Sequence, residues 1–188
     1  MELDQLVKEF HLSCQNNNVE KLRDCLARGV DVNLVDQDWS GLNIAAYYGH
    51  SETLDVLLAH PDIEINKAAN NATALLYTCR FGRAGILSRL VQVPELDINH
   101  QDEDGDTAAH LACYGYYSHS CINHERCVRI LAETGRVDWN KRDNDGQTPL
   151  YFALLRGHSD IADIIMEEPF IDCSVKTEDG DSRGSGDI

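Results

Sequence analysis

The chain has 188 residues, and 32 acidic against 16 basic side chains give it a formal net charge of -16 at pH 7. Clusters of lysine and arginine supply most of the affinity of proteins for nucleic acids, so this balance argues against a nucleic-acid partner and favours a basic one. No run of about 18 apolar residues predicts a membrane helix, and seven cysteines, an odd number, indicate reduced thiols rather than a disulfide framework.

An asparagine recurs along the chain at spacings of about 33 residues, apart from one longer interval of about 41, and Ser174 takes its place at the end. A period of this length indicates stacked units rather than one globular core. The expected units, which together form one domain over 1–174, are 5–33, 34–66, 67–99, 100–140 and 141–174. Residues 175–188 are rich in Gly, Ser and Asp, so we expect a disordered acidic tail there, with a docking peptide as the alternative.

The first unit is expected to hold two helices, over 6–15 and 19–26. It has no recognisable opening turn, and a polar run at 15–18 separates its helices. Stacked arrays need a polar outer face at each end, so this unit reads as an N-terminal cap.

The second and third units depart from each other in their opening residues. Ser-Gly-Leu-Asn at 40–43 opens the second, whereas Thr-Ala-Leu-Leu at 73–76 opens the third. The third also carries Gly85 inside its second helix, where glycine costs about 1 kcal/mol relative to alanine. We therefore expect the third unit to be among the softer ones.

The fourth unit opens with Thr107 and His110 but has about seven extra residues between Cys113 and Asn123. The insertion either lengthens both helices by about one turn or forms a protruding loop, and both alternatives stay open. Trp139 stands at a position where the preceding units carry valine or isoleucine, so it is expected in the core.

The fifth unit carries the clearest helix signals. Thr148 is a good N-cap, Pro149 suits the first helical position, and Gly157 can adopt the left-handed conformation that ends a helix. Residues 159–166 then show the apolar spacing of a second helix with one buried face.

This pattern resembles the ankyrin repeat family, whose units open with Thr-Pro-Leu-His, continue through Ala-Ala and Gly-His, and end in Asp-Val-Asn. The match covers about residues 5–174. The resemblance implies an all-α solenoid of stacked helix-turn-helix units with β-turn or hairpin fingers. It also implies a monomeric protein-interaction module, an adaptor or inhibitor that holds a partner protein or peptide in its concave groove.

The family's variable contact positions are the residue before the turn threonine and the two residues after the Ala-Ala pair. Carried over to this chain, they are Trp39, Tyr47, Tyr48, Ala72, Arg80, Phe81, Asp106, Tyr114, Gly115, Gln147, Leu155 and Arg156. Aromatic and arginine side chains dominate this set, and these types are enriched at interface hot spots. The alternative is that the rings pack sideways on neighbouring units and only stiffen the array.

Acidic residues are expected to surround these positions on the fingers and to steer a basic partner. They are Asp36, Asp38, Asp102, Glu103, Asp104, Asp143 and Asp145. The alternative is that they only keep the chain soluble.

Cysteine and histidine side chains gather at the insertion and give a different candidate function, a zinc-binding module or sensor. The candidate ligands are Cys113, Cys121, His124 and Cys127. Their spacing is irregular, and Cys127 falls on the core-facing side of the expected helix. No catalytic constellation is recognisable, so neither an enzyme nor a cofactor is expected.

Residues 1–10 lack the apolar core of a signal peptide. We therefore expect a cytoplasmic location, with the nucleus as the alternative.

Overall fold

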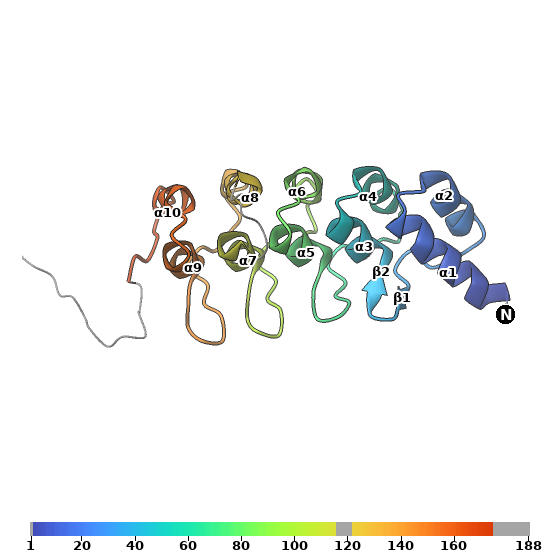
Figure 1. Cartoon of the computed structure of the whole chain (residues 1–188), viewed down its shortest axis with the longest axis horizontal. Coiled ribbons are helices and arrows are strands. Elements are labelled where there is room, and N and C mark those ends of the chain that lie inside the picture. The colour runs from blue at the N-terminus through green and yellow to red at the C-terminus, as the bar shows by residue number, and fades with distance from the viewer. Residues whose placement is uncertain (1, 116–121, 175–188) are drawn as a thin grey trace, which may run out of the picture.

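A computed structural model describes residues 2–115 and 122–174 of the chain. Its helices stand in two parallel rows, and the loops between successive helix pairs project beyond one row as fingers (Figure 1). The row beside the fingers contains α1 (Glu2–Gln15), α3 (Gly41–Tyr48), α5 (Ala74–Arg80), α7 (Ala108–Tyr114) and α9 (Pro149–Leu155). The outer row contains α2 (Val19–Ala27), α4 (Ser51–Leu58), α6 (Ala84–Leu90), α8 (Ile122–Glu133) and α10 (Ser159–Met166).

The first finger is a short antiparallel hairpin of β1 (Val35–Asp36) and β2 (Trp39–Ser40). Gln37 and Asp38 form its turn with φ of 48° and 66°, the left-handed conformation that short hairpin turns require. The all-α solenoid with finger turns, expected from the sequence, is therefore confirmed.

Hydroxyl side chains start the inner helices of the second to fifth units. Each accepts a hydrogen bond from the backbone N–H three residues further on, and the residues are Ser40, Thr73, Thr107 and Thr148. Pro149 occupies the first turn of α9 as expected, and Gly157 follows the helix with a φ of 71°. The second helix of this unit spans Ser159–Met166, also as expected.

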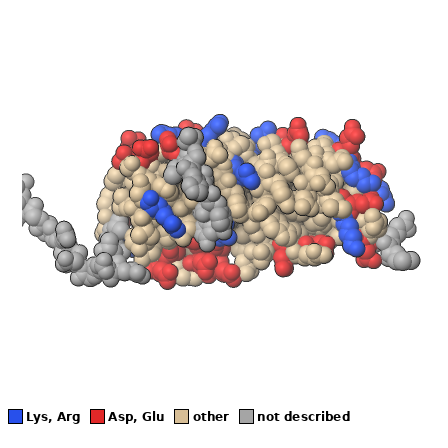
Figure 2. Space-filling model, viewed as in Figure 1, with Lys and Arg blue, Asp and Glu red and all other residues tan. Residues whose placement is uncertain are grey.

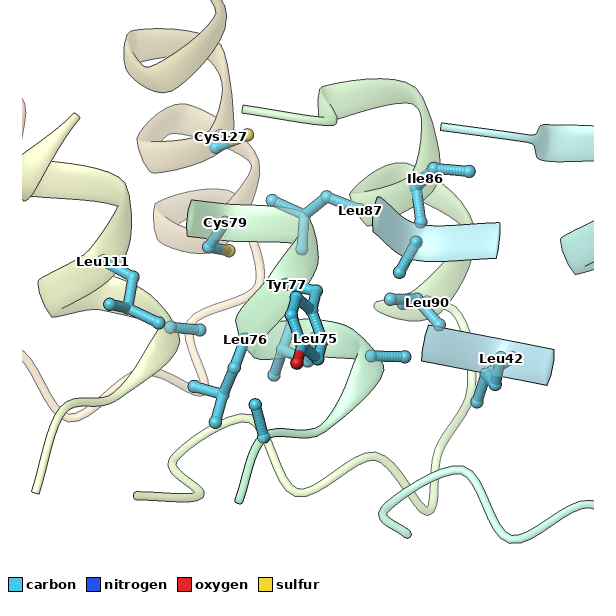
Figure 3. Packing of buried hydrophobic residues seen from close by; sticks show 14 of the residues in the cluster. Leu42, Leu75, Leu76, Tyr77, Cys79, Ile86, Leu87, Leu90, Leu111 and Cys127 are labelled. Atoms are coloured by element: carbon cyan, nitrogen blue, oxygen red, sulfur yellow. The ribbon is translucent and has the colours of Figure 1, made fainter. Parts of the chain in front are cut away.

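One continuous core runs along the stack, because every unit buries its apolar faces against its neighbours. Around α5, Leu75 and Leu76 lie among Leu87 and Leu90 of α6 and Leu111 of α7 (Figure 3). Trp139 is only 5% exposed, so its expected place in the core is confirmed.

An asparagine ladder ties each unit to the next and explains the spacing of this residue in the sequence. Its members, Asn33, Asn66, Asn99 and Asn140, each make two hydrogen bonds with the backbone of the following unit. The side-chain Nδ2 donates to a carbonyl at 2.6 to 3.0 Å, and the Oδ1 accepts from an N–H at 2.7 to 2.8 Å. Ser174 ends the ladder, and its hydroxyl bonds to Asp172 instead.

A second ladder links inner helices to the finger of the next unit. His11 Nε2 donates to the carbonyl of Trp39 at 3.0 Å, and Asn43 Nδ2 donates to that of Ala72 at 2.9 Å. His110 Nε2 donates to the carbonyl of Gln147 at 3.2 Å. In the third unit the equivalent residue is Leu76, whose side chain has no hydrogen-bond donor.

A third ladder runs backwards along the stack, from the start of the outer helix in the second to fifth units to the end of the inner helix in the preceding unit. His50, Arg83, His124 and His158 donate to the carbonyls of Gln15, Tyr47, Arg80 and Cys113, at 3.0, 3.0, 3.3 and 3.1 Å. These contacts give His50 and His158 a structural role.

The insertion of the fourth unit does not lengthen both helices. Helix α7 has 7 residues, as do α5 and α9, so the expectation of a longer first helix is wrong. Helix α8 has 12 residues, whereas α4, α6 and α10 have 7 or 8, so only the second helix gains about one turn. The alternative of a protruding loop between Cys113 and Asn123 falls largely on 116–121, and these residues and the expected tail at 175–188 lie outside the described residues. No helix within the described ranges has the length and apolar character needed to span a membrane.

Candidate functional site

An aromatic cluster covers α3 and α5 on the side of the fingers. It consists of Trp39, Tyr47, Tyr48, Tyr77 and Phe81. Trp39 stacks on Tyr77 with ring centroids 5.1 Å apart, and Tyr47 meets Phe81 edge-on at 4.7 Å. The rings therefore bridge the second and third units, which is the sideways packing that the sequence left open.

The aromatic cluster still presents surface to solvent. Tyr48 is 41% exposed, and Trp39, Tyr47 and Phe81 are half-buried, whereas Tyr77 is buried. A cleft of about 300 Å³ lies beside the cluster and is lined by Trp39, Tyr47 and Tyr48 together with His11 and Gln15 of α1. This cleft can take an apolar or aromatic side chain.

Tyr77 was not among the expected contact residues, although its spacing from Arg80 in the sequence could have identified it. It precedes Arg80 by three residues, so both lie on the same face of α5. Phe152 bears the same relation to Leu155 in α9, and it also lies in the groove.

A second hollow of about 530 Å³ lies between the fourth and fifth fingers and the inner helices; we call it the acidic cleft. Its floor is apolar and contains Phe81, Leu111, Tyr114 and Phe152. Tyr114 and Phe152 meet edge-on with centroids 5.6 Å apart. The guanidinium of Arg156 covers the Tyr114 ring at 3.9 Å from its centroid, a cation–π contact.

Carboxylates line the mouth of the acidic cleft. They belong to Asp104, Asp106, Asp143 and Asp145, and Arg80 is the basic residue among the lining side chains. Acidic side chains gather along the edge formed by the fingers, below α7 and α9 (Figure 2). This arrangement suits a cationic group that enters over an aromatic floor.

Asp102 was expected among the acidic residues around the groove, but its side chain is held by Arg80 and by the backbone of its own finger. Its side chain is 5% exposed and lies 3.4 Å from Arg80. Its Oδ1 accepts hydrogen bonds from the backbone N–H groups of Asp104 and Asp106, at 3.1 and 2.9 Å. Asp143 holds the fifth finger in the same way. These two carboxylates shape the fingers, whereas Asp104 and Asp145 remain exposed.

Asp106 has an altered acidity. Burial, followed by the nearby carboxylates of Asp102, Asp143 and Asp104, raises its pKa to about 7, and Arg80 opposes that shift. Its Oδ1 is buried and has no hydrogen-bond partner among the described residues. A cation placed in the acidic cleft would lower this pKa and stabilise the charged form.

The remaining expected contact residues lie along the same face. Leu155 is 60% exposed, and Arg156 is exposed beside Tyr114. Ala72 is buried, and Gly115 ends α7 in the left-handed conformation, so neither offers a contact side chain.

The described zinc candidates have structural surroundings. His124 uses its Nε2 in the third ladder, although its buried Nδ1 has no partner among the described residues. Burial raises the pKa of Cys127 to about 12 and that of Cys113 well above its usual value, which opposes the thiolate form that zinc binds. Cys121 lies outside the described residues. Within the described ranges, no three His, Cys, Asp or Glu side chains are grouped so that they could hold a metal ion.

A family model described as ankyrin repeats (3 copies) matches residues 10–102, 42–119 and 83–177. The chain is 27% identical over 188 residues to the nuclear factor NF-kappa-B p105 subunit of Gallus gallus, covering 92% of this chain and 18% of the relative. It is 24% identical over 201 residues to the putative ankyrin repeat protein YahD of Escherichia coli (strain K12), covering 88% and 98%.

A third relative is the probable 26S proteasome regulatory subunit p28 of Saccharomyces cerevisiae, 23% identical over 134 residues, covering 71% of this chain and 56% of the relative. The chain thus spans less than a fifth of the chicken relative and little more than half of the yeast one.

Proposed function

Because the chain belongs to the ankyrin repeat family, we propose that it is an adaptor or inhibitor that holds a partner protein or peptide in the groove between fingers and inner helices. Ankyrin repeats are protein-interaction modules, and proteins built from them are generally not enzymes. Two of the relatives are named as subunits of larger assemblies, which supports an interaction role here.

The observation that carries the proposal is the position of Phe81. Its ring belongs to the aromatic cluster through Tyr47 and also lines the acidic cleft. An apolar surface and an acidic one are therefore continuous along the groove. The partner that fits both has apolar anchors followed by lysine or arginine, because interface hot spots favour aromatic pockets and opposite charges steer the encounter.

We further propose that the chain acts as a monomer without chemistry or cofactors of its own. Its described cysteines are free, and Cys14, Cys25, Cys79, Cys113 and Cys127 are buried. Such thiols suit a reducing compartment, which supports a location in the cytoplasm or nucleus.

Affinity capture from the native cell with matched baits tests the proposed groove. One variant joins Trp39→Ala with Phe81→Ala, and a second joins Asp104→Lys with Asp145→Lys. The control joins Glu95→Lys with Glu133→Lys. These exposed acids line neither cleft, and their replacement changes the net charge by the same amount as the variant of Asp104 and Asp145.

The wild type and the control should recover the same partner, and both groove variants should lose it. With purified partner, each groove variant should bind at least tenfold more weakly while its helical circular dichroism stays intact, since a buried hot-spot residue contributes about 2 kcal/mol. Full affinity in both groove variants would place the site elsewhere.

A further inference from the structure

The far end of the stack differs from every earlier boundary between units. In the first four units, one inner-helix position is fully buried, and its residues are Cys14, Ala46, Cys79 and Cys113, each 0% exposed. The equivalent residue of the fifth unit is Leu154, which is 49% exposed. The position is therefore buried in the first four units and half-exposed in the fifth, where it carries a larger apolar side chain.

This position faces the next unit. A Cβ added to Gly41 of the second unit would lie 3.2 Å from the Sγ of Cys14 in the first. Cys79 of α5 likewise has Cys127 of α8 as a neighbour (Figure 3). Leu154 thus points toward the place where a sixth helix pair would pack.

A second position on α9 also lies on the side that meets the next unit. His11, Asn43 and His110 precede the buried position by three residues, and each donates to the finger of the next unit. Asn43 and His110 are 0% and 1% exposed. Tyr151 takes this place in the fifth unit and remains half-buried.

The outer row gives an independent comparison. Leu58 of α4, Val91 directly after α6 and Ala132 of α8 occupy equivalent positions, where they are partly buried and pack against the core. Met166 of α10 is 45% exposed. Tyr151, Leu154 and Met166 thus occupy the positions that meet the next unit elsewhere in the stack, and we call these three residues the end face.

The end face is unlike a cap. The segment after α10 runs down the same end of the stack (Figure 1), and it includes Phe170, which is 95% exposed at a φ of 66°. Terminal units of stacked arrays usually carry a polar outer face, and contiguous exposed apolar surface marks an interaction site.

Two observations define what fits the end face. At every earlier boundary, the element that covers the equivalent residues is a helix, as α7 covers α5 and α9 covers α7. Asp163 is exposed on α10 one turn before Met166, and Glu167, the exposed C-cap residue of α10, lies one turn after Asp163. A second copy of the chain would bring these carboxylates against their equivalents, whereas lysine or arginine would pair with them.

We propose that the end face docks an amphipathic helix of a partner protein, with apolar residues against Leu154 and Met166 and basic residues against Asp163 and Glu167. This contact is separate from the groove. It lets the chain hold a second protein while the groove is occupied, as an adaptor requires.

A synthetic helical peptide with a leucine face flanked by lysine is the probe. Its affinity for the full chain is measured by fluorescence anisotropy beside a peptide of equal composition and scrambled order. The end-face variant joins Leu154→Gln with Met166→Gln, and the matched control is Leu12→Gln, because Leu12 is 54% exposed on α1 at the other end of the stack.

The end-face variant should bind the amphipathic peptide at least tenfold more weakly than the wild type. The Leu12→Gln control should bind it as the wild type does. Circular dichroism checks that each variant is folded, and substitution of exposed side chains should leave it unchanged.

Equal binding by the wild type and the end-face variant, or by the scrambled peptide, would overturn the proposal. So would sedimentation that shows a dimer of the wild type and a monomer of the end-face variant, because the face would then belong to a second copy. Binding that appears only after removal of residues 175–188 would assign the face to that segment instead.

Discussion

Asp106 lowers the stability of the folded chain at neutral pH. Its pKa of about 7 in the folded chain exceeds the ordinary value of 3.8. Between these pH values the folded protein keeps a proton that the unfolded chain releases, so stability falls as the pH rises through this window. The charged form therefore disfavours folding at neutral pH, which a basic partner would offset.

Replacement of Asp106 by asparagine should raise the free energy of unfolding at pH 8 by about 1 kcal/mol, a figure discounted because the side chain is partly solvent-screened. At pH 5 the gain should be smaller, because the native carboxyl is then protonated. Urea unfolding at the two pH values measures both gains. Asp145→Asn, which removes an exposed carboxylate of the next finger, is the control. An equal gain for Asp106→Asn at both pH values would contradict the explanation.

Sequence reasoning worked best for residues whose role is local. Thr148 and Pro149 predict their helix start because capping depends only on the adjacent turn. The roles of Tyr77 and Asp102 depend on residues from other elements, which are a ring stacked on Trp39 and an ion pair with Arg80. The sequence could identify candidate contact positions, but it could not show which of their side chains are packed within the fold and which are exposed.

At the scale of helices, the third unit has two features that should weaken it. The second ladder skips it, because Leu76 stands where Asn43 and His110 donate to the next finger. Helix α6 also contains Gly85, which is exposed. The low local stability that the sequence predicts for this unit therefore has two candidate causes in the structure. A substitution of Gly85 removes one of them.

Gly85→Ala should stabilise the chain by about 1 kcal/mol, because a Cβ there meets nothing within 4 Å and alanine loses less backbone entropy in a helix. Chemical denaturation gives the gain, and hydrogen exchange should slow in α5 and α6. Gly49→Ala is the contrasting variant: its φ is 81° and its Cβ would meet Arg83 at 3.2 Å, so it should destabilise. No gain from Gly85→Ala would show that another feature limits this unit.

For the whole molecule, the repeated register made the stack predictable, since each unit fills equivalent positions with similar side chains and neighbouring units complete its hydrogen bonds. The asparagine spacing predicted the repeating units, and the first ladder shows the hydrogen bonds that these asparagines make. The end face was not predictable in the same way. Leu154 is an ordinary helix residue in the sequence, and only comparison with Ala46 and Cys113 in three dimensions shows it to be uncovered.

The charge of the whole chain leads to the last prediction, which concerns association with the groove partner. The net charge is -16, and exposed acids lie along the finger edge (Figure 2). Opposite charges speed the encounter at low ionic strength, and salt screens them beyond about 10 Å at 0.1 M. The association rate of a basic partner should therefore fall about tenfold between 0.05 M and 0.5 M salt, while dissociation changes little. In stopped-flow measurements, the variant of Asp104 and Asp145 should associate more slowly with a flatter salt dependence. The variant of Glu95 and Glu133 has the same net charge, so equal slopes in the two variants would mean that only total charge matters and that the acidic cleft does not steer the partner.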